Sequence, residues 1–73
     1  MKEEIIFKSY NQYNYSKKAI KVNYATKKII VYYGGQCPIS YDKKTTTKYI
    51  NDKIEEYKQL GFTVEDYKPS YER

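Results

Sequence analysis

The sequence predicts a small α+β domain, in which an antiparallel or mixed sheet carries one helix packed on one face. Three observations lead to this prediction. Apolar and polar residues alternate in short N-terminal segments, a stretch of apolar residues at helical spacing follows them, and the length of 73 residues suits one domain. The predicted order is β-β-β-α-β, with residues 1–73 as a single domain and 68–73 as a loose tail.

The first strand is predicted over residues 3–10, where alternation places Ile6, Lys8 and Tyr10 on one face. Residues 11–17 are polar and rich in turn-forming types, although they include two tyrosines. We therefore expect an exposed loop after the first strand.

The second strand is predicted over residues 18–25, because apolar and polar side chains alternate there as they do in a strand with one wet face. A tight turn is expected before a third strand at 28–33. That strand is apolar on both faces and stops at Gly34-Gly35. Residues 36–42 are expected to form a loop.

The helix is predicted over residues 45–60, because Ile50, Ile54 and Tyr57 fall on one stripe, with Leu60 and Tyr49 on its flank. Its start can be capped by one of several side chains: Asp42, Thr45, Thr46 or Thr47.

Gly61 is the expected left-handed stop of the helix, with Phe62 folding back on Tyr57 in a Schellman-type closure. A short last strand over residues 62–67 follows, and Pro69 ends it.

One helix cannot cover both faces of a four-stranded sheet, so the second face is expected to be solvated or bound to a partner. The residues assigned to that face by alternation are Ile6, Lys8, Tyr10, Ile30, Tyr32, Glu65 and Tyr67.

The composition is basic and rich in tyrosine, with a formal net charge of +5 and 11 tyrosines. Positive charge favours anionic partners such as nucleic acid, acidic proteins or phosphorylated ligands. Lys, Ile, Asn and Tyr are encoded by AT-rich codons, so genomic base composition is one explanation of the bias. Tyrosine is also a rigid contact residue that is favoured at interfaces.

The sequence argues against catalysis and against a cofactor or metal. The absence of histidine removes the common nucleophile pairs and most zinc and iron sites. Cys37 lies in Gly-Gly-Gln-Cys-Pro, which indicates a turn, and Gly34-Gly35 lacks the spacing of a phosphate-binding loop. Adjacent acidic residues on a strand point to opposite faces and form no dyad.

A lysine- and threonine-rich stretch precedes the predicted helix and is a candidate anion site, because helix N-termini bind phosphate or carboxylate groups. The alternative is a solvated helix start. The candidate anion-binding residues are Lys43, Lys44, Thr45, Thr46 and Lys48.

Tyrosines interleaved with lysines suggest a second candidate, a surface that binds a protein or single-stranded nucleic acid. Core tyrosine in a domain short of Phe and Leu is the alternative. The candidate partner-binding residues are Tyr10, Tyr13, Tyr15, Tyr32, Tyr33 and Lys8.

A lone cysteine and the lack of a long apolar run indicate a cytoplasmic protein with no membrane association. Because 73 residues build only a small core, we expect a marginal monomer or a homodimer.

In size, composition and lack of motifs, the chain is similar to small proteins carried by phages and other mobile elements of AT-rich bacteria. Many of those block a host enzyme or a defence system such as a CRISPR effector. The leading hypothesis is a non-enzymatic inhibitor or adaptor that binds a protein or nucleoprotein. The alternatives are a nucleic-acid-binding module, capture of a phosphorylated ligand, and a toxin-type ribonuclease.

Overall fold

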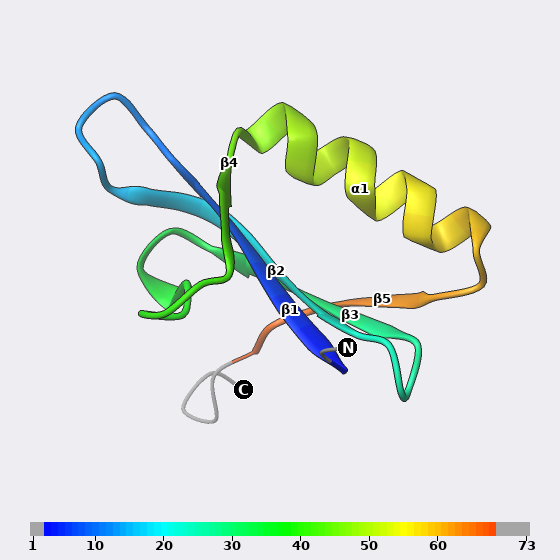
Figure 1. Cartoon of the computed structure of the whole chain (residues 1–73). Coiled ribbons are helices and arrows are strands. Elements are labelled where there is room, and N and C mark those ends of the chain that lie inside the picture. Colours follow the sequence, from blue (N-terminus) through cyan, green and yellow to red (C-terminus); the bar gives the residue numbers. More distant parts are fainter. Residues whose placement is uncertain (1–2, 69–73) are drawn as a thin grey trace.

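The computed structural model describes residues 3–68 and shows a mixed sheet with one helix lying across one face (Figure 1). This is the α+β class that the sequence predicts. The elements in chain order are β1 (Glu4–Tyr10), β2 (Ser16–Asn23), β3 (Lys28–Tyr33), the 3-10 turn η1 (Gly34–Gln36), β4 (Lys43–Thr45), α1 (Thr47–Gln59) and β5 (Thr63–Asp66).

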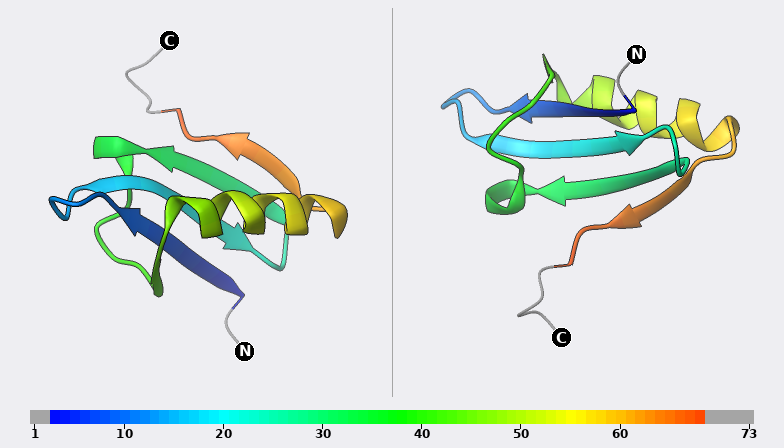
Figure 2. Two further views of the ribbon diagram at one scale, coloured as in Figure 1. Left: turned by 90° about the horizontal axis from the view of Figure 1, so that it is seen from above. Right: turned by 60° about the horizontal axis from the view of Figure 1, so that its bottom comes forward.

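The sheet is built around the β1–β2–β3 meander and has the strand order β4-β1-β2-β3-β5. The meander is antiparallel, whereas β4 pairs with β1 and β5 pairs with β3 in parallel. In the register, Ile20 of β2 lies between Phe7 and Val31. The two outer strands, β4 and β5, are joined by α1, which crosses the sheet from one edge to the other (Figure 2).

The prediction of four strands is wrong by one strand, because β4 lies just before α1 where a loop or the helix start was expected. Lys43 to Thr45 have no apolar alternation that would mark a strand. The segment is extended because it pairs with Phe7 to Ser9 of β1, which is distant in the sequence. The observed order is therefore β-β-β-β-α-β.

The core lies between α1 and one face of the sheet, and the predicted helix stripe faces it. Ile50 is fully buried and Tyr57 nearly so, while Ile54 packs at the margin. The buried core residues of the sheet are Phe7, Ile20, Val22, Ile29 and Val31. Their strand neighbours consequently face the opposite side of the sheet.

Both ends of α1 have the kind of capping that was predicted, a side-chain N-cap at the start and a Schellman motif at the end. The Thr46 hydroxyl accepts a hydrogen bond from the Tyr49 amide at 3.1 Å, so Thr46 is the N-cap. At the other end Gly61 has φ +96°, and the Phe62 amide donates to the Tyr57 carbonyl at 3.0 Å. The Gly61 amide donates to the Lys58 carbonyl, which completes the Schellman motif.

The segment from η1 to β4 runs back across the sheet on the side opposite α1, as the right view of Figure 2 shows. This segment covers part of the sheet face that was predicted from the sequence to be solvated or bound to a partner. Among residues 3–68, no helix is long and apolar enough to cross a membrane. Except for Lys68, the predicted loose tail at 68–73 lies outside the described residues.

Candidate functional site

The loop between β1 and β2 holds two tyrosines out into solvent on a fixed backbone. The Asn11 side-chain oxygen accepts hydrogen bonds from the Tyr13 amide at 2.9 Å and the Tyr15 amide at 3.1 Å. Backbone bonds from Asn11 to Tyr15 and from Asn14 to Asn11 close the loop. Asn14 takes the left-handed conformation that Asn tolerates, with φ 64°. Tyr13 and Tyr15 are each 69% exposed, although their backbones are tied down.

The segment between η1 and β4 is anchored to the sheet by Lys8, whose side chain is 5% exposed. Its ammonium donates to the Pro38 carbonyl at 2.5 Å and lies 3.5 Å from the Ile39 carbonyl. The same ammonium lies 5.4 Å from the Tyr10 ring centroid and 5.6 Å from that of Tyr41. Carbonyl oxygens and aromatic faces thus stabilise the buried cation.

This anchoring leaves the Ile39 side chain pointing into solvent, with 97% of its surface exposed. An aliphatic side chain held at almost full exposure contributes nothing to the core. Ile39 is not among the residues predicted from the sequence, although it stands as an isolated Ile between Pro38 and Ser40 in a polar stretch.

Tyr10 and Tyr41 form an edge-to-face pair with ring centroids 5.7 Å apart, and the Lys44 ammonium lies 5.1 Å from the Tyr10 centroid. Desolvation, together with the hydrogen bond to Tyr41, raises the pKa of Tyr10. Burial likewise raises the pKa of the nearby Cys37 thiol, against the opposing charge of Lys8. Cys37 therefore stays protonated at neutral pH and is a poor nucleophile.

The remaining predicted contact residues are divided between the two faces of the sheet. Tyr32 is buried and packs on Tyr67, with centroids 4.7 Å apart. Tyr33 is half exposed on the helix side, where its hydroxyl donates to the Asp66 carboxylate at 3.2 Å and Lys18 lies over its ring. Lys8 and Tyr32 therefore lie under the surface residues and have almost no solvent-exposed area that a partner could contact.

The candidate anion-binding residues do not converge in the structure. Lys43 and Lys44 are successive residues of β4 and therefore point to opposite faces, while Thr45 ends that strand. The Thr46 hydroxyl is used as the N-cap, and Lys48 is paired with Asp52 at 3.4 Å.

Positive charge is concentrated outside the helix. Residues 5–41 contain six lysines and no acidic residue, whereas α1 contains three lysines and three acidic residues. Ion pairs within α1 join Lys48 to Asp52, Lys53 to Glu56 and Lys58 to Glu55. The basic character of the chain therefore belongs mainly to the meander, its loops and β4.

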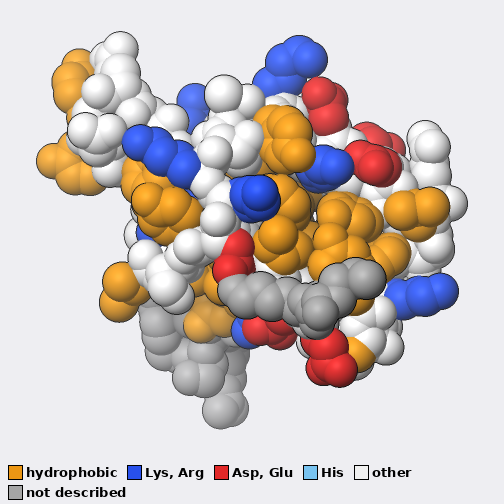
Figure 3. Space-filling view, in the orientation of Figure 1, with side chains coloured by type: hydrophobic (Ala, Val, Ile, Leu, Met, Phe, Trp, Pro, Cys, Tyr) orange, Lys and Arg blue, Asp and Glu red, His pale blue; other side chains and the backbone are white. Residues whose placement is uncertain are grey.

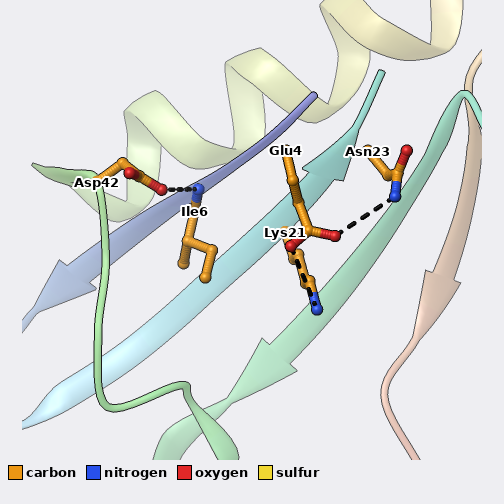
Figure 4. A network of polar contacts seen from close by, with 5 residues as sticks. All are labelled: Glu4, Ile6, Lys21, Asn23 and Asp42. Carbon is orange, nitrogen blue, oxygen red and sulfur yellow. Dashed lines mark hydrogen bonds and ion pairs between the residues drawn. The ribbon is translucent and has the colours of Figure 1, made fainter. Parts of the chain in front are cut away.

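A shallow, acidic hollow lies at the other end of β1, and its polar groups serve the fold. The Asp42 carboxylate accepts a hydrogen bond from the Ile6 amide at 2.9 Å (Figure 4). The Glu4 carboxylate forms an ion pair with Lys21 at 3.6 Å and accepts a hydrogen bond from the side-chain amide nitrogen of Asn23 at 3.4 Å. Within residues 3–68, no three His, Cys, Asp or Glu side chains are grouped so as to hold a metal ion.

We define the hairpin-end surface as the exposed side chains of the β1–β2 loop and of the segment before β4, with the lysines beside them. Its members are Tyr13, Tyr15, Ile39, Tyr41, Lys17 and Lys44. In Figure 3, separate hydrophobic side chains lie along the left side of the molecule over these two segments, with mainly white side chains and backbone between them. Comparison with known proteins found no matching family model, curated protein or solved structure.

Proposed function

We propose that this chain is a non-enzymatic protein-binding module, an inhibitor or adaptor, that docks through its hairpin-end surface. The observations that support this proposal most strongly are the exposure of Ile39, at 97%, and that of Tyr13 and Tyr15, at 69% each. All three lie on loops whose backbones are fixed by internal hydrogen bonds.

Fixed loops with large exposed side chains are suited to binding, because their backbones lose little conformational entropy when a partner binds. Each rotamer-rich side chain that becomes ordered on binding costs about 0.5–1.5 kcal/mol, and flexible loops add to this cost. Here Asn11 orders one loop and Lys8 the other before any partner arrives. Tyrosine itself has few rotatable bonds and buries a large area.

Nucleic acid is the second candidate partner, favoured by the acid-free lysine-rich stretch over residues 5–41 and by the exposed rings of Tyr13 and Tyr15. Bases stack on aromatic rings, and lysines neutralise phosphates. Ile39 distinguishes the two partners, because an aliphatic side chain offers no flat face for a base but fits an apolar pocket of a protein. The geometry therefore favours a protein.

The sequence analogy suggests the kind of protein, namely a host enzyme or a defence nucleoprotein of the kind that phage-borne proteins block. A cytoplasmic location is part of the same proposal. A second copy of this chain is the other protein partner that the sequence leaves open. Light scattering across a concentration series separates a homodimer from a monomer.

The direct test is capture of partners from a bacterial lysate by the tagged protein, with and without nuclease. We expect a stoichiometric protein that survives nuclease and is lost with Tyr13→Ser/Tyr15→Ser. The matched control is Leu60→Ser, which changes an exposed apolar residue at the far end of α1. Circular dichroism checks that both variants fold.

Two results would contradict the proposal. Recovery of nucleic acid alone, lost on nuclease treatment, would move the assignment to the second candidate. Equal capture by the wild type and the tyrosine double variant would show that the hairpin-end surface is not the docking site.

A further inference from the structure

We infer that the outer edge of β5 is a site of self-association, at which a second copy of this chain continues the sheet across a twofold axis. The site includes no residue of the hairpin-end surface, so it goes beyond the proposed function. Three features carry the inference, namely the unpaired backbone of this edge, the charges along it, and the register that these charges select.

The outer edge of β5 has no neighbouring strand in the part of the chain that the structure describes, because β5 is last in the strand order (Figure 2). The Tyr67 amide donates to the Val31 carbonyl at 2.8 Å, so pairing with β3 continues one residue beyond β5. Backbone N–H and C=O groups alternate in direction along a strand, so those of Asp66 and Lys68 point outward. Lys68 precedes Pro69, which favours an extended backbone. Such an edge is a template for a further strand.

The charge along this edge differs from the basic character of the whole chain. β5 has the sequence Thr-Val-Glu-Asp, and Lys68 follows two residues after it. The side chains of Glu65, Asp66 and Lys68 are exposed and line an open hollow. Copies of a chain with a net charge of +5 repel each other at long range, but here each copy presents both signs within a few residues. The edge is therefore able to complement itself in charge.

A twofold axis normal to the sheet pairs two β5 edges in antiparallel fashion, and the charges select where the axis lies. With the axis at Tyr67, Asp66 of each copy lies opposite Lys68 of the other. Each of these is a hydrogen-bonded pair, in which the two residues exchange both N–H···O bonds. An axis at Asp66 would place two Asp66 carboxylates opposite each other, and an axis at Glu65 would do the same for Glu65. Like charges directly opposite are destabilising, so the register centred on Tyr67 is favoured.

The same axis brings the two Tyr67 side chains together. They meet at a non-hydrogen-bonded pair, where facing side chains are closest. The Tyr67 ring is 38% exposed and packs on Tyr32, with 4.7 Å between the ring centroids, so its position on the sheet is defined. Aromatic pairs across antiparallel strands are stabilising. The centre of the interface is thus aromatic, with an opposite-charge pair on each side.

The first test is sedimentation equilibrium of the full-length chain, at concentrations up to about 1 mM because an interface this small is expected to be weak. We expect a monomer–dimer equilibrium. Asp66→Lys and Lys68→Asp, each alone, place like charges opposite and are expected to weaken dimerisation by about tenfold. The double variant Asp66→Lys/Lys68→Asp is expected to restore it. Tyr33→Phe is the control, because it removes the hydrogen bond from the Tyr33 hydroxyl to Asp66 without changing a charge.

The second test reads the register by cross-linking in a Cys37→Ser background, which removes the one native cysteine. Tyr67→Cys places two thiols at a non-hydrogen-bonded pair, whose Cα atoms lie about 4.5 Å apart, within reach of a disulfide. We expect a covalent dimer in a glutathione redox buffer. Glu65→Cys is the matched control on the same face, because its two copies lie roughly 13 Å apart along the strands in this register. Circular dichroism checks that each variant folds.

The inference is overturned by a chain that stays monomeric at about 1 mM, which would show that the acidic residues keep this edge apart. It is also overturned if the single charge variants dimerise like the wild type, if the double variant does not recover, or if Glu65→Cys cross-links as readily as Tyr67→Cys. A dimer that is lost with Tyr13→Ser/Tyr15→Ser would move self-association to the hairpin-end surface. Failure here leaves the proposed function standing, because lysate capture tests that function at other residues.

Discussion

Replacement of Ile50 by Ala tests whether α1 packs on the sheet as the structure shows. Ile50 is fully buried at the centre of the helix stripe, against strands that are fixed by their own pairing and cannot collapse into a cavity. Large-to-Ala substitutions at such sites cost about 2–5 kcal/mol, and we expect about 3 kcal/mol here. For a chain of 73 residues the whole free energy of unfolding is about 4–11 kcal/mol, so the loss is a large share of it.

The assay is urea unfolding followed by far-UV circular dichroism, with the slope m compared between variants so that a change in midpoint can be interpreted as a change in stability. Leu60→Ala is the matched control, because Leu60 lies at the end of the same helix but is 61% exposed. We expect that control to change the free energy of unfolding by less than about 0.5 kcal/mol. A loss below about 1 kcal/mol for Ile50→Ala, or equal losses for the two variants, would refute the assigned helix face.

Three further predictions concern the two ends of α1 and the contact between Tyr24 and Tyr57, and each is measured by the same unfolding assay. Thr46→Ala removes the N-cap hydroxyl and is expected to cost about 1 kcal/mol, whereas Thr46→Ser should retain most of the stability. Gly61→Ala places a side chain at φ +96° with open space around it, so its cost, about 1 kcal/mol, is conformational and leaves the core packing unchanged. Burial, together with the 2.6 Å hydrogen bond between the Tyr24 and Tyr57 hydroxyls, raises the pKa of Tyr57 above its usual value of 10.0. Because the folded state then holds this proton more tightly than the unfolded state, stability is full below about pH 10 and falls as the pH rises beyond it, and Tyr57→Phe should make that fall shallower. An unchanged alkaline slope in Tyr57→Phe would contradict this assignment.

The sequence predicts the elements that have a local pattern. Alternation places Ile6 and Lys8 on the face opposite the helix, and the spacing of Ile50 and Tyr57 identifies the buried stripe of α1. The closure at Gly61 is also predicted, because its chemistry is contained within a few consecutive residues.

The features that the sequence could not predict depend on contacts between distant residues. Residues 43–45 form strand β4 because they pair with the backbone of β1. The sequence Lys-Lys-Thr has no apolar alternation from which this strand could have been predicted. The segment between η1 and β4 is held against the sheet by a hydrogen bond from the Lys8 ammonium to the carbonyl oxygen of Pro38, which lies thirty residues further along the chain. Lys8, which was predicted as a partner contact, is therefore buried and supports this segment, whereas Ile39 is the side chain that is left exposed.

The route of α1 across the sheet, between strands that lie at opposite edges, has a consequence for how the chain folds during synthesis. The meander is complete once residue 33 has been made, but its apolar face has no cover at that point. The helix that covers it is fastened to the first edge by β4 and to the second by β5, whose residues 63–66 are made after the helix itself. Docking of α1 between both fastenings therefore waits until β5 has been made, which favours one concerted step over gradual assembly. Until then the nascent chain carries an uncovered apolar sheet, and this is the stage at which it is most exposed to aggregation and to capture by chaperones.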